Sequence, residues 1–337
     1  MLADELAPIG IEQPVFISGL ARSGSTVLLE ILAQHPDVAT HRYRDFPMLY
    51  TPYWWNWFLD RQPRKPVEAQ ERAHGDGLLV TTESPEAMEE VLWMGFFPGL
   101  HDPGRSNLLD ATSEAPEFER FYRDHIRKLL YLRGGRRYVS KGNYNIGRLA
   151  YLLKLFPDAR LVLPVRQPLG HIASLAKQHR RFAEVHAANP RALAHMQRVG
   201  HFEFGGDRRP INPGADHAIQ SILELWRHGQ EVRGLARYWA LLYGFVGERL
   251  EADPALRTAT LVVRYEDLVG EPRATIEQLF AHARLEPPPG VIDRYAGELR
   301  MPQYYEPSFT KDDLLAIEEE TGAVARRFGY PRAAEAA

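Results

Sequence analysis

The sequence predicts an α/β fold in which a mainly parallel sheet is flanked by helices, with inserted helical and loop segments that form a cap. Short apolar runs alternate along the chain with stretches of helical spacing, which is the pattern of a parallel sheet covered on both faces. The first apolar run ends in a turn rich in glycine and hydroxyl groups, and a helix follows at once. With 337 residues, 45% of them hydrophobic, the chain is long enough to bury a large core.

The expected elements follow in order and describe one domain over residues 1–337. Its core is expected at 14–330 and its cap segments at 41–135 and 180–215; the polar, Gly- and Pro-containing stretch 180–215 is expected to be a loop or lid. After the first strand, loop and helix in 14–35, the expected strands are 138–140, 161–166 and 261–265. The expected helices are 117–130, 145–156, 169–178, 216–228, 231–250, 275–283 and one that opens at a capping box at Thr310 and ends near Phe328.

Composition excludes several classes of function. The net charge is −3 and no polybasic run occurs, which argues against a dedicated nucleic-acid or membrane-surface binder. The chain has no Cys, so a disulfide framework and a thiolate zinc site are impossible, and its 13 His residues show no metal-ligand spacing, so no metal is expected. No apolar run approaches membrane-spanning length and no signal peptide is evident, so a cytoplasmic location is expected.

The stretch after the first apolar run is expected to cradle phosphate. Backbone N–H groups of a glycine-rich loop point inward, and the N-terminus of the following helix adds partial positive charge. The spacing from Gly19 to Gly24 is that of a P-loop, so the sheet is expected to be of the P-loop type. The usual Lys is missing, since Ser25 and Thr26 stand there, and the cation is Arg22 inside the loop.

The run Arg-Ser-Gly-Ser-Thr over residues 22–26 resembles the 5′-phosphosulfate loop of sulfotransferases, which use 3′-phosphoadenosine 5′-phosphosulfate (PAPS) as co-substrate and release PAP. The resemblance implies that the 5′-phosphosulfate is held by the loop residues Ala21, Arg22, Ser23, Gly24, Ser25 and Thr26.

A second pair of residues suits a phosphate. An Arg at a strand end grips phosphate bidentately, and a Ser two turns into the next helix donates a hydrogen bond. Arg166 and Ser174 have this arrangement and resemble the element of sulfotransferases that binds the 3′-phosphate. Gln167 departs from the usual Asp or Asn, a difference that concerns helix capping more than phosphate contact.

Two further elements carry the resemblance. Lys141 follows a short strand, and its place in bacterial and Golgi-type sulfotransferases implies a position near the transferring group. There a cation would neutralise the charge that develops as PAP leaves, so Lys141 and Arg22 are the expected catalytic cations. Residues 264–268, Arg-Tyr-Glu-Asp-Leu, resemble a late element of the same family that supports the nucleotide site, and Tyr265 is expected to bind cofactor.

The residues that would bind the acceptor and take its proton are harder to identify from the sequence. In tyrosylprotein relatives a catalytic Glu lies in the segment after the first helix, but here the nearest proton acceptors are Asp45, expected first, and His41, expected second. Glu83 is the outside candidate for the base. The acidic cluster that Glu83 forms with Glu86, Glu89 and Glu90 is a second source of a base, from a neighbouring loop, but for Glu86, Glu89 and Glu90 the solvated face of a helix is favoured. The aromatic cluster over residues 53–57 is interpreted as core packing or as a stacking platform for the acceptor.

We therefore expect a PAPS-dependent sulfotransferase that modifies a hydroxyl, or less favourably an amine, on a small molecule, carbohydrate or lipid-linked acceptor. No nucleic-acid partner is expected, and the acceptor and the oligomeric state are not predicted. Two alternatives stay open: a P-loop kinase acting on a small molecule, and a catalytically silent nucleotide-binding protein of the same fold.

Overall fold

The computed structural model describes residues 2–62, 69–71, 79–301 and 309–331. Parts of the expected cap and core, residues 63–68, 72–78 and 302–308, lie outside the described residues. The strands are β1 (Val15–Ile17), β2 (Val38–Ala39), β3 (Gln70–Glu71), β4 (Leu79–Val80), β5 (Arg137–Lys141), β6 (Arg160–Val165) and β7 (Thr260–Arg264). Short 3-10 helices span Tyr43–Asp45, Asn143–Gly147 and Gly205–Asp207.

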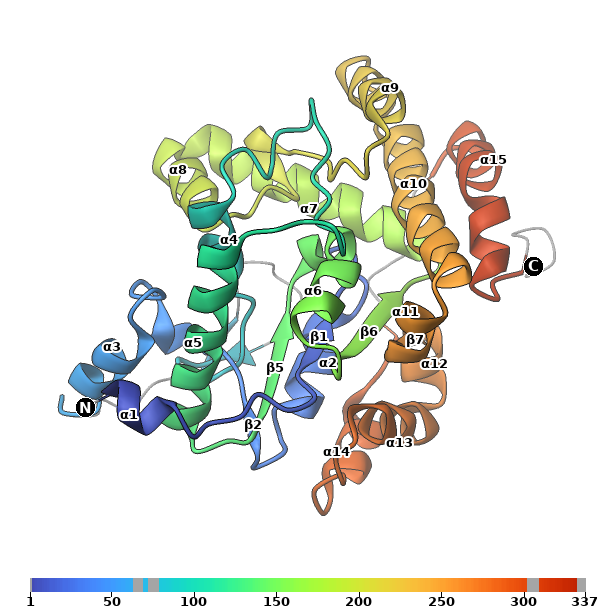
Figure 1. Cartoon of the computed structure of the whole chain (residues 1–337). Helices are drawn as coiled ribbons and strands as arrows, with labels where there is room; N and C mark the ends of the chain where they lie inside the picture. The colour runs from blue at the N-terminus through green and yellow to red at the C-terminus, as the bar shows by residue number, and fades with distance from the viewer. Residues whose placement is uncertain (1, 63–68, 72–78, 302–308, 332–337) are drawn as a thin grey trace.

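The α-helices cover both faces of the main sheet (Figure 1). They are α1 (Leu2–Leu6), α2 (Ser25–Leu32), α3 (Pro52–Leu59), α4 (Glu90–Phe96), α5 (Pro116–Arg133), α6 (Leu149–Leu155), α7 (Pro168–Ala188), α8 (Pro190–Arg198), α9 (Asp216–Arg227), α10 (Glu231–Ala252), α11 (Pro254–Ala259), α12 (Tyr265–Gly270), α13 (Pro272–Ala283), α14 (Val291–Glu298) and α15 (Lys311–Arg327).

The main sheet is parallel and has the strand order β2-β5-β1-β6-β7, which confirms the predicted α/β fold. Its central strand is buried on both sides because successive side chains point to opposite faces. Phe16 packs into a core cluster with residues of α5, α6 and α10. Val15 and Ile17 pack into a second cluster with α2, α13 and α14. A continuous apolar run is what such a doubly covered strand requires.

Pro164 is tolerated in β6 because of the register of the neighbouring strand. β1 pairs with β6 only as far as Ile17 opposite Val162, so β6 extends past the end of β1 at the position of the proline. The Pro164 carbonyl accepts a hydrogen bond from the Tyr243 hydroxyl at 3.0 Å. A proline here therefore lies where the ladder toward β1 has ended.

The expectation of a loop over residues 180–215 is wrong for most of that stretch. α7 continues to Ala188 because Phe182 and His186, one turn apart, are both buried. Asn189 then caps α8 by accepting a hydrogen bond from the Arg191 amide at 3.1 Å. The polar residues that suggested a loop lie on the outer faces of these helices. The capping box predicted at the start of the last helix is confirmed, since Thr310 and Asp313 bond reciprocally.

Candidate active site

The carboxyl ends of neighbouring strands bring the predicted cofactor residues together. The loop 18–24 follows β1, Lys141 ends β5, Arg166 follows β6 and Tyr265 follows β7. Ligands of open parallel sheets bind beyond this edge. A cavity of about 960 Å³ lies there, and its lining includes Ala21, Arg22, Gly24, Ser25, Thr26, Lys141, Arg166 and Tyr265.

The loop between β1 and α2 has a conformation that only glycine tolerates at one position. Gly24 has a φ of 96°, and a Cβ placed on it would lie 2.7 Å from the Tyr265 ring. Gly24 is also the N-cap of α2, so the amides of Ser25 and Thr26 begin that helix. Backbone amides in the first turn of a helix favour an anion, as the sequence pattern predicts.

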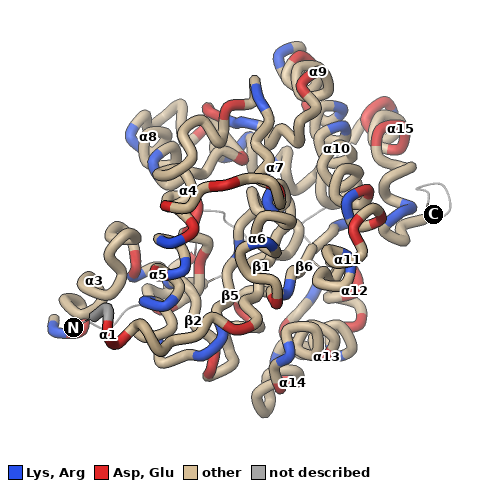
Figure 2. The backbone as a smooth tube through the Cα atoms, in the orientation of Figure 1, with Lys and Arg blue, Asp and Glu red and all other residues tan. Residues whose placement is uncertain are grey.

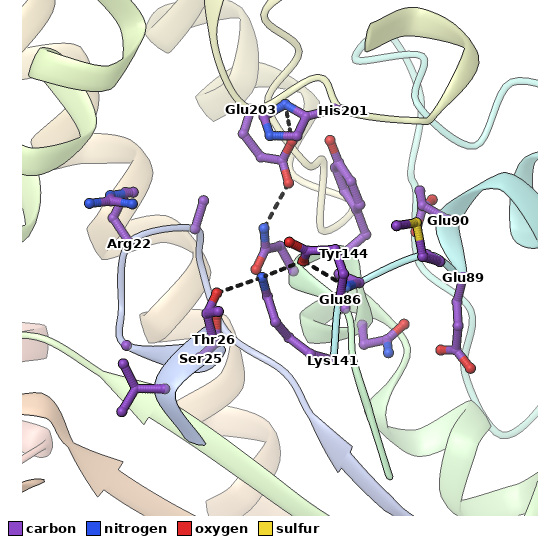
Figure 3. Close-up of a pocket in the computed structure, with 18 of the residues that line it drawn as sticks. Arg22, Ser25, Thr26, Glu86, Glu89, Glu90, Lys141, Tyr144, His201 and Glu203 are labelled. Atoms are coloured by element: carbon purple, nitrogen blue, oxygen red, sulfur yellow. Dashed lines mark hydrogen bonds and ion pairs between the residues drawn. The ribbon is translucent and has the colours of Figure 1, made fainter. Parts of the chain in front are cut away.

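Arg22 lies with Ser174 rather than with Lys141. Its φ of 71° is left-handed, which is uncommon for a residue with a side chain and is typical of functional loops. Its Nε donates to the Ser174 Oγ at 3.1 Å, and its carbonyl accepts from Arg166 Nη1 at 3.3 Å. Figure 3 shows its side chain turned away from Lys141. Arg22, Arg166 and Ser174 thus form one group, and Lys141 lies at another part of the cavity.

Contacts with Tyr265, Gly170 and Glu266 hold Arg166 and Gln167 in place. The Arg166 guanidinium lies over the Tyr265 ring, 4.5 Å from its centroid, and only 6% of the residue is exposed. Gln167 caps α7 by accepting from the Gly170 amide at 3.2 Å, so it does replace the usual Asp or Asn as a cap. Glu266 accepts from the Gln167 amide at 3.1 Å, which ties residues 264–268 to the same strand end.

His171 supports the loop 18–24, and the sequence analysis missed this residue. Its Nε2 bonds to the Ala21 carbonyl at 2.8 Å and its Nδ1 to the Trp239 Nε1 at 3.1 Å. A carbonyl can only accept and an indole N–H can only donate, so the ring is neutral with its proton on Nε2. Burial lowers the pKa of His171 to about 3, which agrees with that tautomer. No motif identifies it, since it is one of 13 His residues in the chain.

Lys141 lies between the start of α2 and a carboxylate. Its Nζ donates to the Thr26 Oγ1 at 3.0 Å and lies 3.7 Å from the Glu86 Oε1 (Figure 3). Glu86 also accepts from the Tyr43 hydroxyl and from the Ala87 amide, the latter at 2.7 Å. The carboxylate is therefore held in place next to the one Lys that the sequence analysis selected.

The expectation that Glu86, Glu89 and Glu90 lie on a solvated helix face is wrong. Glu86 lines the cavity, and Glu89 is only 3% exposed. Glu89 accepts hydrogen bonds from the hydroxyls of Tyr122, Tyr138 and Ser140, because β5 and α5 turn these groups toward it.

Glu90 is held by cations instead. It accepts two bonds from Arg148, at 2.7 and 2.9 Å, and bonds to His101 at 2.6 Å. Burial opposes ionisation of Glu90, but Arg148 and His101 outweigh it and lower its pKa to about 2. The start of α4 is thus anchored by the carboxylates of Glu89 and Glu90, which follow Met88.

The rest of the cavity is lined by apolar and polar side chains together. Its apolar lining residues beyond the loop include Phe46, Leu49, Met88, Val91, Val199, Phe204, Leu299 and Met301. The polar lining residues include a group that the sequence analysis missed: the His201 Nδ1 lies 3.1 Å from Glu203, and Asn143 donates to Glu203 at 2.8 Å. Figure 3 shows this group on the far side of Lys141 from the strand ends.

The three sequence candidates for the base are not among the described residues that line the cavity. Asp45 is fully buried, with Arg133 Nη2 at 2.5 Å and His41 Nδ1 at 3.5 Å. Burial opposes its ionisation, but His41 and Arg133 outweigh that and hold the pKa of Asp45 well below its usual range. His41 bonds to His125 at 3.0 Å. Glu83 is half exposed and pairs with Arg42 and Arg44.

The segment 41–45 nevertheless reaches the site through another residue. The Tyr43 amide donates to the Ser84 carbonyl at 3.1 Å, and the Glu86 amide donates to the His41 carbonyl at 3.1 Å. These bonds pair the two segments side by side and bring Tyr43 to Glu86. The stretch after the first helix therefore contributes a hydroxyl to the cavity, and its neighbour contributes the carboxylate.

Among residues 2–62, 69–71, 79–301 and 309–331, no cluster of three or more His, Cys, Asp or Glu side chains suits a metal ion. Within those same ranges, no helix has the length and apolar character needed to cross a membrane.

Comparison with known proteins identifies the family. The profile of the sulfotransferase family matches residues 14–205, more than half of the chain, so the chain belongs to the sulfotransferase family. It is 25% identical over 349 residues to the omega-hydroxy-beta-dihydromenaquinone-9 sulfotransferase Stf3 of Mycobacterium bovis and of Mycobacterium tuberculosis, covering 95% of this chain and 76% of each relative. The crystal structure of sulfotransferase STF9 from Mycobacterium avium has the same fold, with a TM-score of 0.55 and 14% identity over 97% of this chain and 80% of that one.

Proposed function

We propose that this protein transfers the sulfuryl group of PAPS to a hydroxyl at the end of an apolar acceptor and releases PAP. The observation that carries the proposal is the contact of Lys141 with Thr26 on one side and Glu86 on the other. This contact places the loop, with its cation and its backbone amides, next to the apolar part of the cavity, and the Glu86 carboxylate lies between them. Sulfuryl transfer from a nucleotide to a neutral acceptor needs this arrangement.

The donor contacts divide into two groups. The amides and hydroxyls of Ser25 and Thr26, with Lys141, hold the 5′-phosphosulfate. Arg166, Ser174 and Arg22 hold the 3′-phosphate. This assignment moves Arg22 from the transferring group to the 3′-phosphate, and it is supported by the 3.1 Å bond from Arg22 to Ser174. Ala21 and Gly24 supply backbone, Ser23 packs beneath the loop, and Tyr265 stacks against Arg166.

The transfer step balances with one proton acceptor. The acceptor oxygen forms a bond to sulfur as the bond from sulfur to the bridging oxygen of PAPS breaks, and PAP leaves with that electron pair. Lys141 neutralises the charge that develops on the leaving oxygen. Glu86 takes the acceptor proton, in place of Asp45, His41 and Glu83, because it faces the cavity next to Lys141. As in phosphoryl transfer, positioning and electrostatics supply most of the acceleration.

The acceptor is proposed to be apolar, with a hydroxyl favoured over an amine. Apolar side chains, among them Phe46, Leu49 and Met88, line a large part of the cavity wall beyond Lys141. The similar mycobacterial enzyme is named for a hydroxylated menaquinone, a molecule of this class. Among the classes considered at the outset, small-molecule, carbohydrate and lipid-linked, a lipid-linked or other apolar alcohol fits such a wall best.

The two alternatives fit the site less well. A P-loop kinase needs a Lys for the β- and γ-phosphates in the loop, and Ser25 occupies that place. A silent nucleotide-binding protein would not need a carboxylate held beside Lys141. Both remain measurable: the kinase would consume ATP with Mg²⁺, and the silent protein would bind PAP without turnover on any alcohol.

The test is a product assay with PAPS and a series of apolar alcohols, read by mass spectrometry. The wild type is expected to form a sulfate ester and PAP in equal amounts. Glu86→Gln is expected to lower kcat by about 10²–10⁴-fold, the usual contribution of a general base. Glu83→Gln is the matched control, because it changes a nearby carboxylate that pairs with Arg42 and Arg44 outside the cavity. An inactive Glu83→Gln beside an active Glu86→Gln would contradict the assignment.

A further inference from the structure

Residues 46–59 form an unusual surface. The segment Phe-Pro-Met-Leu-Tyr-Thr-Pro-Tyr-Trp-Trp-Asn-Trp-Phe-Leu has no charged residue and is half aromatic. Among the described residues, half of the large apolar side chains that are exposed lie in it: Phe46, Met48, Tyr50, Trp54, Trp57 and Phe58. Monomeric soluble proteins seldom gather exposed apolar groups in this way without a function.

The helix in this segment has its polarity reversed. On α3 the outward residues Trp54, Trp57 and Phe58, at helical spacing, are 58%, 43% and 49% exposed. The inward residue Asn56 is fully buried. A surface helix ordinarily buries its apolar stripe and exposes its polar one. Folding of this chain alone therefore gives no reason for the outward aromatic face.

Polar contacts fix this orientation. The Asn56 Nδ2 donates to the Asp45 Oδ1 and to the Pro52 carbonyl, both at 2.9 Å. Its Oδ1 accepts from Arg133 Nη1 at 3.2 Å. The Trp55 Nε1 donates to the Arg44 carbonyl at 2.8 Å. The buried group around Asp45, which is outside the cavity, thus holds α3 with its aromatic face outward.

The surface is continuous with the cavity through the chain that precedes α3. Phe46 and Leu49 line the cavity, whereas Met48 and Tyr50, between and after them, are 46% and 41% exposed. Phe46 is itself 37% exposed, so it lies at the opening. An apolar path therefore leads from the face of α3 into the apolar half of the cavity.

Size and chemistry favour a lipid bilayer over a second copy of the chain. Six aromatic and Met side chains, about half exposed, offer on the order of 500 Å², which is less than the roughly 800 Å² per partner of a stable protein interface. Trp and Tyr are the residues that concentrate at the boundary between lipid and water. Arg61, two residues after the end of α3, lies 3.7 Å over the Trp57 ring, which places a cation at the rim. Figure 2 shows α3 uncharged at the edge of the molecule.

We propose that the face of α3 formed by Trp54, Trp57 and Phe58 docks on the surface of a lipid bilayer. The helix is immersed at headgroup depth and the opening at Phe46 faces the membrane, so that an apolar molecule passes from the bilayer into the cavity. The low net charge argued against a membrane-surface binder that acts through basic residues, whereas this docking relies on exposed aromatic side chains. The inference does not depend on the identity of the group transferred.

The test is flotation of the purified protein with phosphatidylcholine vesicles, alone and with phosphatidylglycerol added. The wild type is expected to float with both, because residues 46–59 are uncharged. The triple variant Trp54→Ala, Trp57→Ala, Phe58→Ala is expected to bind at least tenfold more weakly, with an unchanged circular dichroism spectrum. The matched control is Leu314→Ala with Leu315→Ala, which removes two exposed apolar side chains on α15.

A second variant separates docking from misfolding. Trp54→Phe with Trp57→Phe keeps the apolar face, so it is expected to float like the wild type while losing the quenching of tryptophan fluorescence by brominated lipid. The proposal would be overturned if the wild type failed to float or if the triple variant floated equally well. It would also be overturned if light scattering showed that the wild type is a dimer and that the triple variant is a monomer. None of these readouts uses turnover, so the outcome is independent of the proposed sulfuryl transfer.

Discussion

The two halves of the cavity are built in different ways. The donor half consists of strand ends and the turns that follow them, with Arg22, Arg166 and Lys141 supplying charge. The acceptor half consists of side chains from the segments 43–49, 86–91, 199–204 and 299–301, and most of them are apolar. The donor half is positioned by backbone geometry at the ends of the strands. The acceptor half is positioned by the packing of side chains from separate segments.

The largest expected effect separates stability from catalysis on the acceptor side. Asp45→Asn leaves the buried Arg133 without its carboxylate, so we expect a loss of about 3–5 kcal/mol in the free energy of unfolding, with kcat of the folded protein nearly unchanged. Denaturant unfolding and turnover measure the two quantities. Asp60→Asn is the control, because that half-exposed carboxylate pairs with Arg44 at the surface. A stable but inactive Asp45→Asn protein would return the base to residues 41–45.

Lys141 should affect the chemical step rather than affinity for the donor. Lys141→Ala removes the cation between Thr26 and Glu86, and kcat is expected to fall by about 10²–10³-fold with a smaller change in KM for PAPS. Steady-state kinetics at saturating acceptor measure both. Lys177→Ala, at an exposed position on α7, is the matched control and should behave like the wild type. A normal kcat in the Lys141 variant would make Lys141 a structural residue.

Glu90 should make part of the stability depend on acid. Its pKa is lowered from 4.5 to about 2, so its stabilisation is present above about pH 4.5 and is lost as the pH falls toward 2. Glu90→Gln is expected to lose about 3 kcal/mol at pH 7 and to unfold with less dependence on pH between 5 and 2. Unfolding by urea at a series of pH values measures this. Glu224→Gln, exposed beside Arg227, should change little, and an unchanged pH dependence in Glu90→Gln would refute the assignment.

Arg166 should affect the donor alone. Arg166→Ala is expected to weaken PAP binding by about 1.5–3 kcal/mol, the range for charge-assisted hydrogen bonds. The affinity for AMP should stay close to that of the wild type. Titration calorimetry gives both values, and Arg180→Ala on the exposed side of α7 serves as control. An equal loss for PAP and AMP would mean that Arg166 does not contact the 3′-phosphate.

The loop of the donor half could be predicted because its residues are neighbours in the sequence. The φ of Gly24 and the helix start at Ser25 are local, and one turn of chain decides both. The orientation of the Arg22 side chain could not be predicted in this way. Arg22 bonds to Ser174, which is 152 positions away in the sequence, whereas it was expected at the transferring group.

The acceptor half depends on contacts that no local pattern contains. Glu89 has the spacing of a solvated helix face, but the hydroxyls of Tyr122 and Tyr138 make burial favourable. Glu86 reaches Lys141 only because residues 82–86 pair with residues 41–44. The polar residues on α7 and α8 suggested a loop. The residues against which these helices pack lie in other segments, so the local sequence does not reveal the helices.

The central claim is that the strand-end cations select a nucleotide with a 3′-phosphate. The most direct measurement is titration of the wild-type protein with PAP and with AMP under the same conditions. Arg166 and Arg22 line one part of the cavity, and the buried Ser174 accepts a hydrogen bond from Arg22 there. PAP is therefore expected to bind at least tenfold more tightly, since one charge-assisted hydrogen bond supplies about 1.5–3 kcal/mol. Equal affinity for the two nucleotides would contradict the account.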